Sequence, residues 1–498
     1  MADDSGGRDG RGIHLPLATD ASMVPSDGAA VISQEPWAAT EGPRGPFGHG
    51  GGSARISLVS ASELPIPSPS TSEIDRASTR LITATSSKRL VGQKKELLRG
   101  KHERYKTHSN LATVPDTTEI NNFEGLKNII LYDPISILLV CWPLGAAAHV
   151  YEWGLPICFW LNFMAMIPLA KILGDATEEL AAGLKNDTVG GLLNATFGNA
   201  VEMILTVQTL RAGHIDVVKG TLLGSVLSNL LLVLGMSFFL GGIKGGKMMG
   251  AEQQFSKEAA LTNMTMLLLA TAAFALPTVF FTDVSDSLRE TQQPLMLEIS
   301  RWCSIYILLA YVAFLIFQLY THIDVFAGSA GEEEEEAHLT VTFACGMLFV
   351  TTCFVAASSE WLVASIDGLV DEWDVSKAFI GIILLPIVGN ACEHAGAVRM
   401  AIADKVDITI GIAVGSSTQI ALFVVPCAVL IGWAIEQPMD LNFGSLYTTV
   451  LVFAVLIAFS IITDGASNWL EGFMLMVAYM IVATMFWFCP DSVDAKIA

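Results

Sequence analysis

The sequence predicts an all-α membrane protein of about 11 transmembrane helices, arranged as an inverted five-plus-five helix repeat with an extra N-terminal helix. Three observations lead to this prediction: apolar segments long enough to cross a bilayer, a low content of charged residues, and a polar motif that occurs twice. Of the 498 residues, 52% are apolar and 15% are charged, which disfavours a soluble globular protein. The formal net charge of -21 also argues against nucleic acid as a partner.

The first 120 residues differ in composition from the rest of the chain. They are rich in Gly, Ser, Thr and Pro, and they cannot bury enough apolar surface to fold, so we expect a disordered tail over 1-120. Its segment 88-106 carries eight Lys or Arg against two Glu. Because basic residues stay on the cytosolic side of a membrane, the N-terminus is expected in the cytosol. Attraction to anionic lipid or to an acidic face of the same protein is an alternative use of this segment.

Apolar segments that follow the tail predict the membrane spans. A helix needs about 20 mostly apolar residues to cross a bilayer. The eleven predicted helices lie at about 131-149, 153-180, 188-211, 217-241, 258-280, 300-320, 338-367, 377-403, 408-435, 445-462 and 468-488. The predicted divisions are a first transmembrane half at 123-325, an acidic linker or helix at 326-338, a second half at 339-488 and a C-terminal tail at 489-498.

An internal repeat links the two halves. Residues 190-235 align without a gap on residues 381-426, and 14 of the 46 positions are identical. The matches include glycine and polar residues in one register, which a shared apolar composition does not explain. Five predicted helices separate equivalent positions, so the second copy should run in the opposite direction across the membrane. In transporters built this way, the binding site lies near the midplane between the repeats.

Each copy contains the motif Gly-Asn-Ala-x-Glu, at Gly198-Glu202 and at Gly389-Glu393. The Asn and Glu of each copy are three residues apart and therefore share a helix face. A helix break at each motif glycine would free backbone carbonyl oxygens toward a cavity lined by protein. The predicted site for a cation and for protons comprises Glu202, Glu393, Asn199, Asn390, Gly198 and Gly389.

Carboxylate, amide and backbone oxygens are the ligands of a hard cation such as Ca²⁺. An ionisable residue inside a membrane costs about 2.5-3.5 kcal/mol, so Glu202 and Glu393 need a reason to be there. Neutral, hydrogen-bonded glutamates that hold helices together are the alternative to a metal site. Nearby polar residues that could support the site are Ser225, Ser228, Ser416, Gln419 and His394. For His394, a proton relay and a hydrogen-bonded spacer both stay open.

Further acidic residues lie outside the repeat. Glu178, Glu179 and Glu360 could form vestibules that lead to the site, although solvation at the membrane interface is an alternative. An acidic run consists of Glu332, Glu333, Glu334, Glu335 and Glu336. It is either a solvated linker or a helix that concentrates or senses Ca²⁺ at the cytosolic mouth.

The paired motifs, the Leu222-Asn229 stretch and the acidic run resemble the Ca²⁺/H⁺ exchanger family, vacuolar type, of the Ca²⁺/cation antiporter superfamily. The resemblance covers roughly residues 123-488. It implies that Glu202 and Glu393 bind Ca²⁺ and protons in turn, and that one helix precedes a five-plus-five core. It also implies residence in the membrane of a vacuole or another acidic organelle.

The expected function is therefore Ca²⁺/H⁺ antiport, with no enzyme activity and no cofactor. The expected partners are the lipid bilayer, Ca²⁺ and protons, and a homo-oligomer is compatible with the sequence. Antiport of Mn²⁺ or of a broader range of divalent cations stays open. Na⁺/Ca²⁺ exchange is a weaker alternative, because the motifs lack the Ser/Thr-rich segments that would coordinate Na⁺. A membrane-embedded metal-dependent hydrolase would normally need a His spacing such as H-E-x-x-H, which the sequence lacks.

Overall fold

The computed structural model describes residues 121-131, 133-244, 252-282, 289-326 and 337-489. These residues belong to one compact unit, Pro115-Ala498. The predicted tail with its basic segment 88-106, the acidic run 332-336 and nearly all of the predicted C-terminal tail lie outside the described residues.

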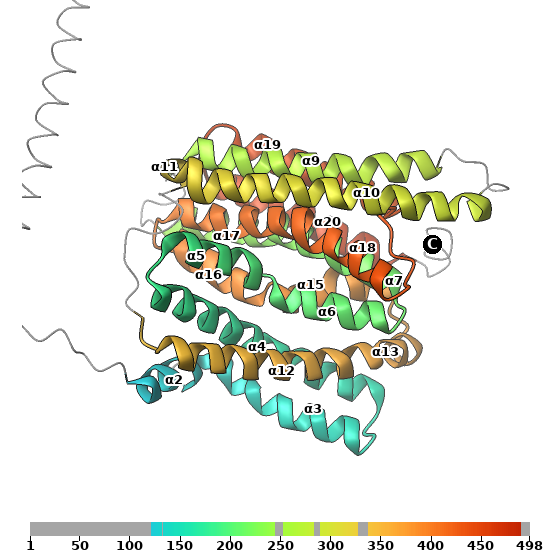
Figure 1. The fold of residues 1–498 in the computed structure, drawn as a ribbon, viewed down its shortest axis with the longest axis horizontal. Coiled ribbons are helices and arrows are strands. Elements are labelled where there is room, and N and C mark those ends of the chain that lie inside the picture. Colours follow the sequence, from blue (N-terminus) through green and yellow to red (C-terminus); the bar gives the residue numbers. More distant parts are fainter. Residues whose placement is uncertain (1–120, 132, 245–251, 283–288, 327–336, 490–498) are drawn as a thin grey trace, which may run out of the picture. The chain divides into compact units, whose positions relative to one another are not determined.

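Almost all of the described secondary structure is helical (Figure 1). Up to residue 244 the elements are α2 (Asn122–Leu131), η1 (Pro134–Val140), α3 (Cys141–Val150), α4 (Leu155–Leu184), α5 (Asp187–Phe197), α6 (Ala200–Arg211), α7 (Ile215–Leu227), η2 (Ser228–Val233) and α8 (Leu234–Lys244). From 252 to 326 they are β1 (Gln253–Gln254), α9 (Lys257–Thr282), α10 (Arg289–Ile316), η4 (Phe317–Thr321) and α11 (Ile323–Phe326).

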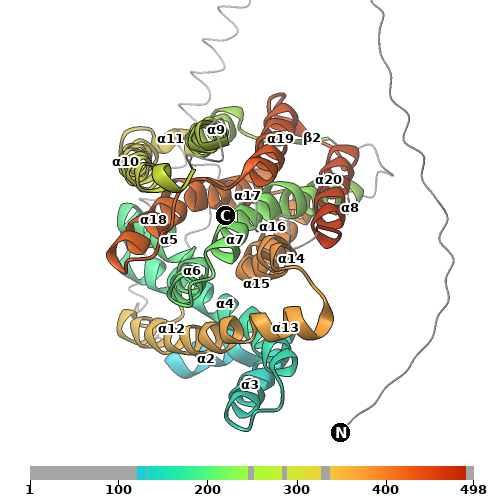
Figure 2. The ribbon, with the colours of Figure 1, turned by 90° about the vertical axis from the view of Figure 1, so that its right-hand side faces the viewer.

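The second half begins at residue 337. Its elements are α12 (Val341–Ala364), α13 (Ile366–Trp373), α14 (Lys377–Phe379), η6 (Ile380–Leu384), α15 (Leu385–Gly389), α16 (Ala391–Ile402), α17 (Val406–Gln419), η7 (Ile420–Val424), α18 (Val425–Ala434), α19 (Ser445–Ile462), β2 (Ala466–Ser467) and α20 (Trp469–Trp487). The short strands β1 and β2 pair antiparallel. In Figure 2, α9, α10 and α19 lie on one side, α2, α3 and α12 lie on the other, and α7 and α14 to α17 lie between them.

The helices have the length and composition of membrane spans. Eight are long and apolar enough to cross a bilayer, or ten if each of two bent helix pairs counts as one span. The predicted helix 188-211 consists of α5 and α6, each too short to cross alone. The predicted helix 131-149 corresponds to Pro134–Val150, which is bent by 85° from the preceding α2, Asn122–Leu131. The all-helical membrane fold is therefore confirmed, whereas the count of eleven stays a prediction.

The predicted helix breaks occur, but one residue later than expected. The backbone leaves the helical region at Asn199 (φ -107°, ψ 26°) and at Asn390 (φ -91°, ψ 14°), whereas Gly198 keeps helical angles (φ -57°, ψ -32°). These values lie near the bridge region, which active-site residues often adopt. At the second break the flanking helices, Lys377–Gly389 and Ala391–Ile402, are bent by 59°.

Two further features recur in the repeats. The half-helices that lead to the breaks each start with a side-chain N-cap, in which Asn186 accepts from Val189 N and Ser376 accepts from Phe379 N. Wide π-helical turns, η2 and η7, follow α7 and α17 at nearly equivalent positions of the repeat. Such turns are frequent at functional sites because they change the register of the side chains.

The equivalent half-helices differ in their surroundings. Most residues of α5 are exposed or half-buried, whereas most residues of α14, η6 and α15 are buried. Asn194 of α5 is exposed, but its equivalent Leu385 is fully buried. Gly220 of α7 packs directly on Gly381 of η6, where an added Cβ would lie 3.4 Å from the facing Cα. The second half-helix is therefore closed against the bundle, and the first is not.

Candidate cation-binding site

The two motif glutamates lie just after the two helix breaks. Glu202 is in the first turn of α6, and Glu393 is in the first turn of α16. The positive end of a helix dipole favours negative charge at this position. Glu202 is 2% exposed, and a Cβ added at Gly389 would lie 3.0 Å from Glu202 Oε1. Because Gly389 begins the second copy of the motif, this contact shows that the two copies meet.

Six buried oxygen atoms of the two motifs, α7 and η2 have no hydrogen-bond partner among the described residues. They are Oε1 and Oε2 of Glu202, Oε2 of Glu393, Oδ1 of Asn390, Oδ1 of Asn229 and Oγ of Ser225. A buried polar atom without a partner costs about 1-3 kcal/mol, so a native fold keeps such atoms only where something else compensates. Carboxylate, amide and hydroxyl oxygens together suit a hard divalent cation, and the two carboxylates also suit protons.

The two motif asparagines have different hydrogen bonds. The Nδ2 of Asn199 donates to Gln419 Oε1 (2.7 Å), and its Oδ1 accepts from Ser416 Oγ (3.3 Å). The Nδ2 of Asn390 donates to the backbone oxygen of Ser225 (3.1 Å), which leaves its Oδ1 without a bond. Asn390 is therefore the better candidate for a cation ligand, and Asn199 stabilises the contact between the repeats.

His394 is hydrogen-bonded through both ring nitrogens. Its Nδ1 lies 2.5 Å from the backbone oxygen of Asn390, and its Nε2 lies 3.5 Å from Ser228 Oγ. A carbonyl oxygen only accepts, so Nδ1 carries the hydrogen and Nε2 accepts from Ser228. This geometry supports the spacer hypothesis for His394, because neither nitrogen is bonded to a carboxylate.

Asn229 is a candidate site residue that the sequence-based prediction did not include. It is fully buried in η2, and its Nδ2 donates to Ser416 Oγ (3.2 Å) while its Oδ1 has no partner. Its repeat equivalent is Ile420, so comparison of the two copies gave no signal for it. The wide turn of η2, which follows the Gly224-Ser225 pair, could have drawn attention to this position.

The three predicted vestibule residues differ in their surroundings. Glu178 follows Gly174 by one turn on the same face of α4, and Gly174 lies against Cys392, the neighbour of Glu393. Glu360 is exposed near the C-terminal end of α12. The carboxylate of Glu179 accepts hydrogen bonds from the backbone of His338 and Leu339, and its place in a vestibule stays a prediction.

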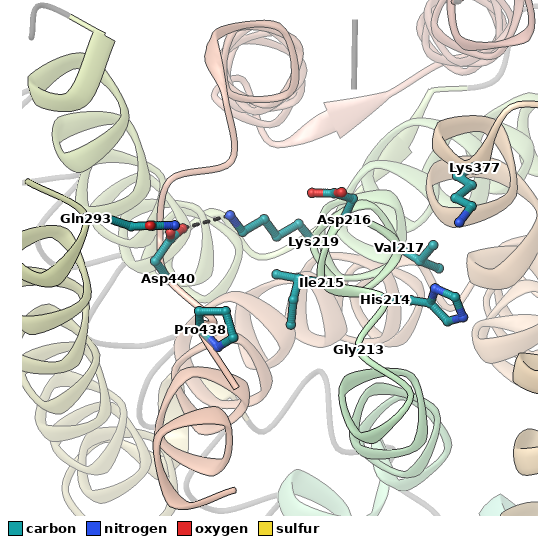
Figure 3. A pocket seen from close by; sticks show the side chains of 10 residues that line it. All are labelled: Gly213, His214, Ile215, Asp216, Val217, Lys219, Gln293, Lys377, Pro438 and Asp440. Carbon is teal, nitrogen blue, oxygen red and sulfur yellow. Dashed lines mark ion pairs between the residues drawn. The ribbon is translucent and has the colours of Figure 1, made fainter. Parts of the chain in front are cut away.

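A separate polar cavity of about 300 Å³ lies where α6 ends and α7 begins (Figure 3). In it the buried Lys219 reaches Asp440 at 2.8 Å, and Asp216 lies beside Lys219. Lys377, which also lines the cavity, pairs with Asp367 at 2.7 Å. None of the lining residues belongs to the predicted site.

Within the described ranges no three His, Cys, Asp or Glu side chains gather into a metal cluster. A cation bound between Glu202 and Glu393 would therefore depend on amide and hydroxyl oxygens as well.

A family described as "Sodium/calcium exchanger protein" matches residues 154-320 and 343-488. This match covers more than half of the sequence and both copies of the motif. The chain belongs to this sodium/calcium exchanger family. Family membership confirms the helical membrane fold and the resemblance predicted from the paired motifs.

Individual relatives align with most of this chain. The "Vacuolar calcium ion transporter" of Schizosaccharomyces pombe is 40% identical over 367 residues, which are 73% of this chain and 87% of that protein. The "Ca(2+)/H(+) antiporter" of Synechocystis is 41% identical over 375 residues, 72% of this chain and 98% of that protein. The solved structure of native YfkE is 37% identical with a TM-score of 0.60, and it covers 71% of this chain and 100% of its own. The relatives from Schizosaccharomyces pombe and Synechocystis are named as transporters, in agreement with the expectation that this protein is not an enzyme.

Proposed function

We propose that this protein is a Ca²⁺/H⁺ antiporter that moves cytosolic Ca²⁺ into an acidic compartment in exchange for protons. The observation that carries the proposal is the set of six buried oxygen atoms without partners, centred on Glu202 and Glu393. A bound Ca²⁺ would use these oxygens as ligands, and protons would neutralise the same two carboxylates. The names of the relatives from fission yeast and Synechocystis support Ca²⁺ and protons as the exchanged ions.

Exchange then follows from competition for one pair of carboxylates. Two protons carry the same charge as one Ca²⁺, so either state leaves the pair neutral. The pair titrates as a unit because the two groups interact. Each pH unit across the membrane supplies about 1.4 kcal/mol per proton, which matches a tenfold gradient of Ca²⁺. A compartment more acidic than the cytosol can therefore drive uptake of Ca²⁺ against its gradient.

The difference between the repeats supports a direction of access. Asn122 bonds to Thr340 N, so the start of the described chain lies at the same end of the bundle as the start of α12. The exposed half-helix α5 begins at this end, directly after α4. With the basic segment 88-106 in the cytosol, this end is cytosolic, and the described conformation receives Ca²⁺ from that side. Glu178 would then attract cations on the cytosolic side and Glu360 on the other.

Location and cation preference belong to the same proposal. Relatives named as vacuolar support a vacuolar or similar acidic-organelle membrane, with the N-terminus in the cytosol. The ligand set would also accept Mn²⁺, because the size of the cation is selected by geometry rather than by ligand type. Inhibition of Ca²⁺ uptake by Mn²⁺ distinguishes a narrow from a broad preference.

The test is uptake of Ca²⁺ by purified protein in sealed vesicles. An acidic interior should drive uptake, a proton ionophore should abolish it, and a Na⁺ gradient at constant pH should have no effect. Uptake that survives the ionophore and follows the Na⁺ gradient would instead indicate Na⁺/Ca²⁺ exchange. No uptake under either gradient would remove the proposal.

A further inference from the structure

Glu178 and Glu179 are neighbours in α4, but they have different partners. Glu178 lies one turn after Gly174 on the same face of α4, and a Cβ added at Gly174 would lie 3.3 Å from Cys392 Sγ, next to the motif residue Glu393. Glu179 Oε2 accepts hydrogen bonds from His338 N (2.8 Å) and Leu339 N (3.0 Å), which directly precede α12. Successive side chains of a helix point about 100° apart, so only one of the two can face the cation site.

The segment in front of α12 is held from two sides. Thr340 N donates to Asn122 Oδ1 of α2 (2.8 Å), and Leu339 is fully buried. Glycines allow this close approach. A Cβ added at Gly125 of α2 would lie 2.6 Å from Leu339 Cδ2, and one added at Gly183 of α4 would lie 2.9 Å from Val341 Cγ2. The start of α12 therefore fits between α2 and the end of α4.

The hydrogen bonds of Glu179 and Asn122 hold the three residues that lead into α12. The N-cap residue Thr340 makes no capping bond with its side chain, so these bonds come from neighbouring helices. The carboxylate of Glu179 and the amide oxygen of Asn122 accept from the amides just before the first turn. A carboxylate that accepts two N-H bonds forms a strong, charge-assisted link between α4 and α12.

The link joins two helices that are already in contact along their lengths. Ser359 Oγ of α12 lies 3.7 Å from Met166 Sδ of α4, and Gly368 of α13 packs on Leu155 at the other end of α4. Both helices also contact the elements that carry the glutamates. Gly174 of α4 lies against Cys392 of α16, and α12 packs against α6.

We propose that Glu179 is a positioning residue that fixes the start of α12 to α4, so that the two helices move as one unit, while Glu178 alone of the two acts in the cation path. The consequence for transport rests on the proposed antiport function. A unit that keeps its shape transmits a movement at one end to both motifs, whereas two loose helices do not. Loss of the link should therefore slow turnover without weakening the binding of Ca²⁺.

Matched substitutions separate the two roles. Both hydrogen bonds of Glu179 end on the same oxygen, so Glu179→Gln keeps an acceptor while it removes the charge. We expect Glu179→Gln to keep both the maximal rate and the KM for Ca²⁺ within about twofold, and Glu179→Ala to lower the rate about fivefold at unchanged KM. Glu178→Gln should instead raise the KM about threefold at a similar rate. A raised KM in Glu179→Gln, or a normal rate in Glu179→Ala, would overturn the proposal.

A readout that needs no transport completes the test. Spin labels are placed on the exposed Cys345 of α12 and on Leu184→Cys at the end of α4, in a chain whose other cysteines are replaced. A narrow distribution of label distances is expected with Glu179 or Gln at position 179, and a broader one in Glu179→Ala. If vesicles show no Ca²⁺ uptake at all, the proposed function fails, but the label distances still decide on Glu179. An equally narrow distribution in Glu179→Ala would contradict the link.

Discussion

Glu202 of the first repeat lies against Gly389 of the second, where an added Cβ would come within 3.0 Å of Glu202 Oε1. This contact joins the two motifs, and an alanine at position 389 would require the Glu202 carboxylate to shift by a few tenths of an ångström. Gly389→Ala should therefore displace the Glu202 carboxylate and weaken Ca²⁺ binding about tenfold, because ligand geometry is sensitive to small shifts. The measurement is the KM for Ca²⁺ uptake. Gly346→Ala in α12 is the control, since no atom lies within 4 Å of its added Cβ, and an equal effect of the two substitutions would contradict the contact.

The difference between the two half-helices predicts one-sided access. Asn194→Cys should react with a membrane-impermeant thiol reagent added from the cytosolic side, because Asn194 is exposed. Its repeat equivalent, Leu385→Cys, should be protected, because Leu385 is fully buried. Labelling rates in oriented vesicles, with the native cysteines replaced, provide the measurement. If Asn194→Cys is labelled at equal rates from the cytosolic side and from the opposite side, the described conformation is not the dominant one.

The ion pair of Lys219 and Asp440 predicts a stability effect away from the cation site. Removing one partner of a buried pair costs up to about 3-5 kcal/mol, and Asp440 is 14% exposed, so we expect about 2 kcal/mol for Lys219→Met. The double substitution with Asp440→Asn should regain most of the lost free energy of unfolding, because no unpaired charge stays buried. Thermal unfolding in detergent provides the comparison. A double variant as unstable as the single one would show that packing, not charge, is lost.

Acid on the side where Ca²⁺ is loaded should weaken the apparent Ca²⁺ affinity. A protonated Glu202 or Glu393 no longer offers a charged oxygen, so protons and Ca²⁺ compete. The sign is fixed: a lower pH on the loading side raises the KM for Ca²⁺, whereas acid on the opposite side accelerates uptake. Initial rates at several pH values on each side check this. A KM that is independent of the pH on the loading side would mean that the two ions use separate sites.

The sequence was sufficient to predict the repeat, the two breaks and the meeting of the motifs, because a constant offset of 191 preserved the glycines and polar residues. The exact break residue was not predictable, since glycine is the more permissive residue but Asn199 and Asn390 adopt the non-helical angles. The hydrogen bonds of Glu179 to the residues before α12 were not predictable, because the sequence does not tell which of two adjacent helix residues faces the site.

Asn229 illustrates a second limit. The repeat comparison highlights residues that both copies share, and Ile420 takes the equivalent place. Only the packing of η2 against α17 shows that its amide reaches Ser416. The same holds for the different roles of Asn199 and Asn390, which are identical in sequence but not in their hydrogen bonds.

The most direct test of a shared site is to count the protons that Ca²⁺ releases when it binds. Purified protein in a weakly buffered solution receives Ca²⁺, and a pH indicator records the protons released per bound ion. The shared site predicts release of up to two protons per Ca²⁺. Glu202→Gln and Glu393→Gln should each bind Ca²⁺ poorly and release fewer protons while the protein stays folded. Tight Ca²⁺ binding without proton release in the unaltered protein, or normal release in both variants, would contradict the account.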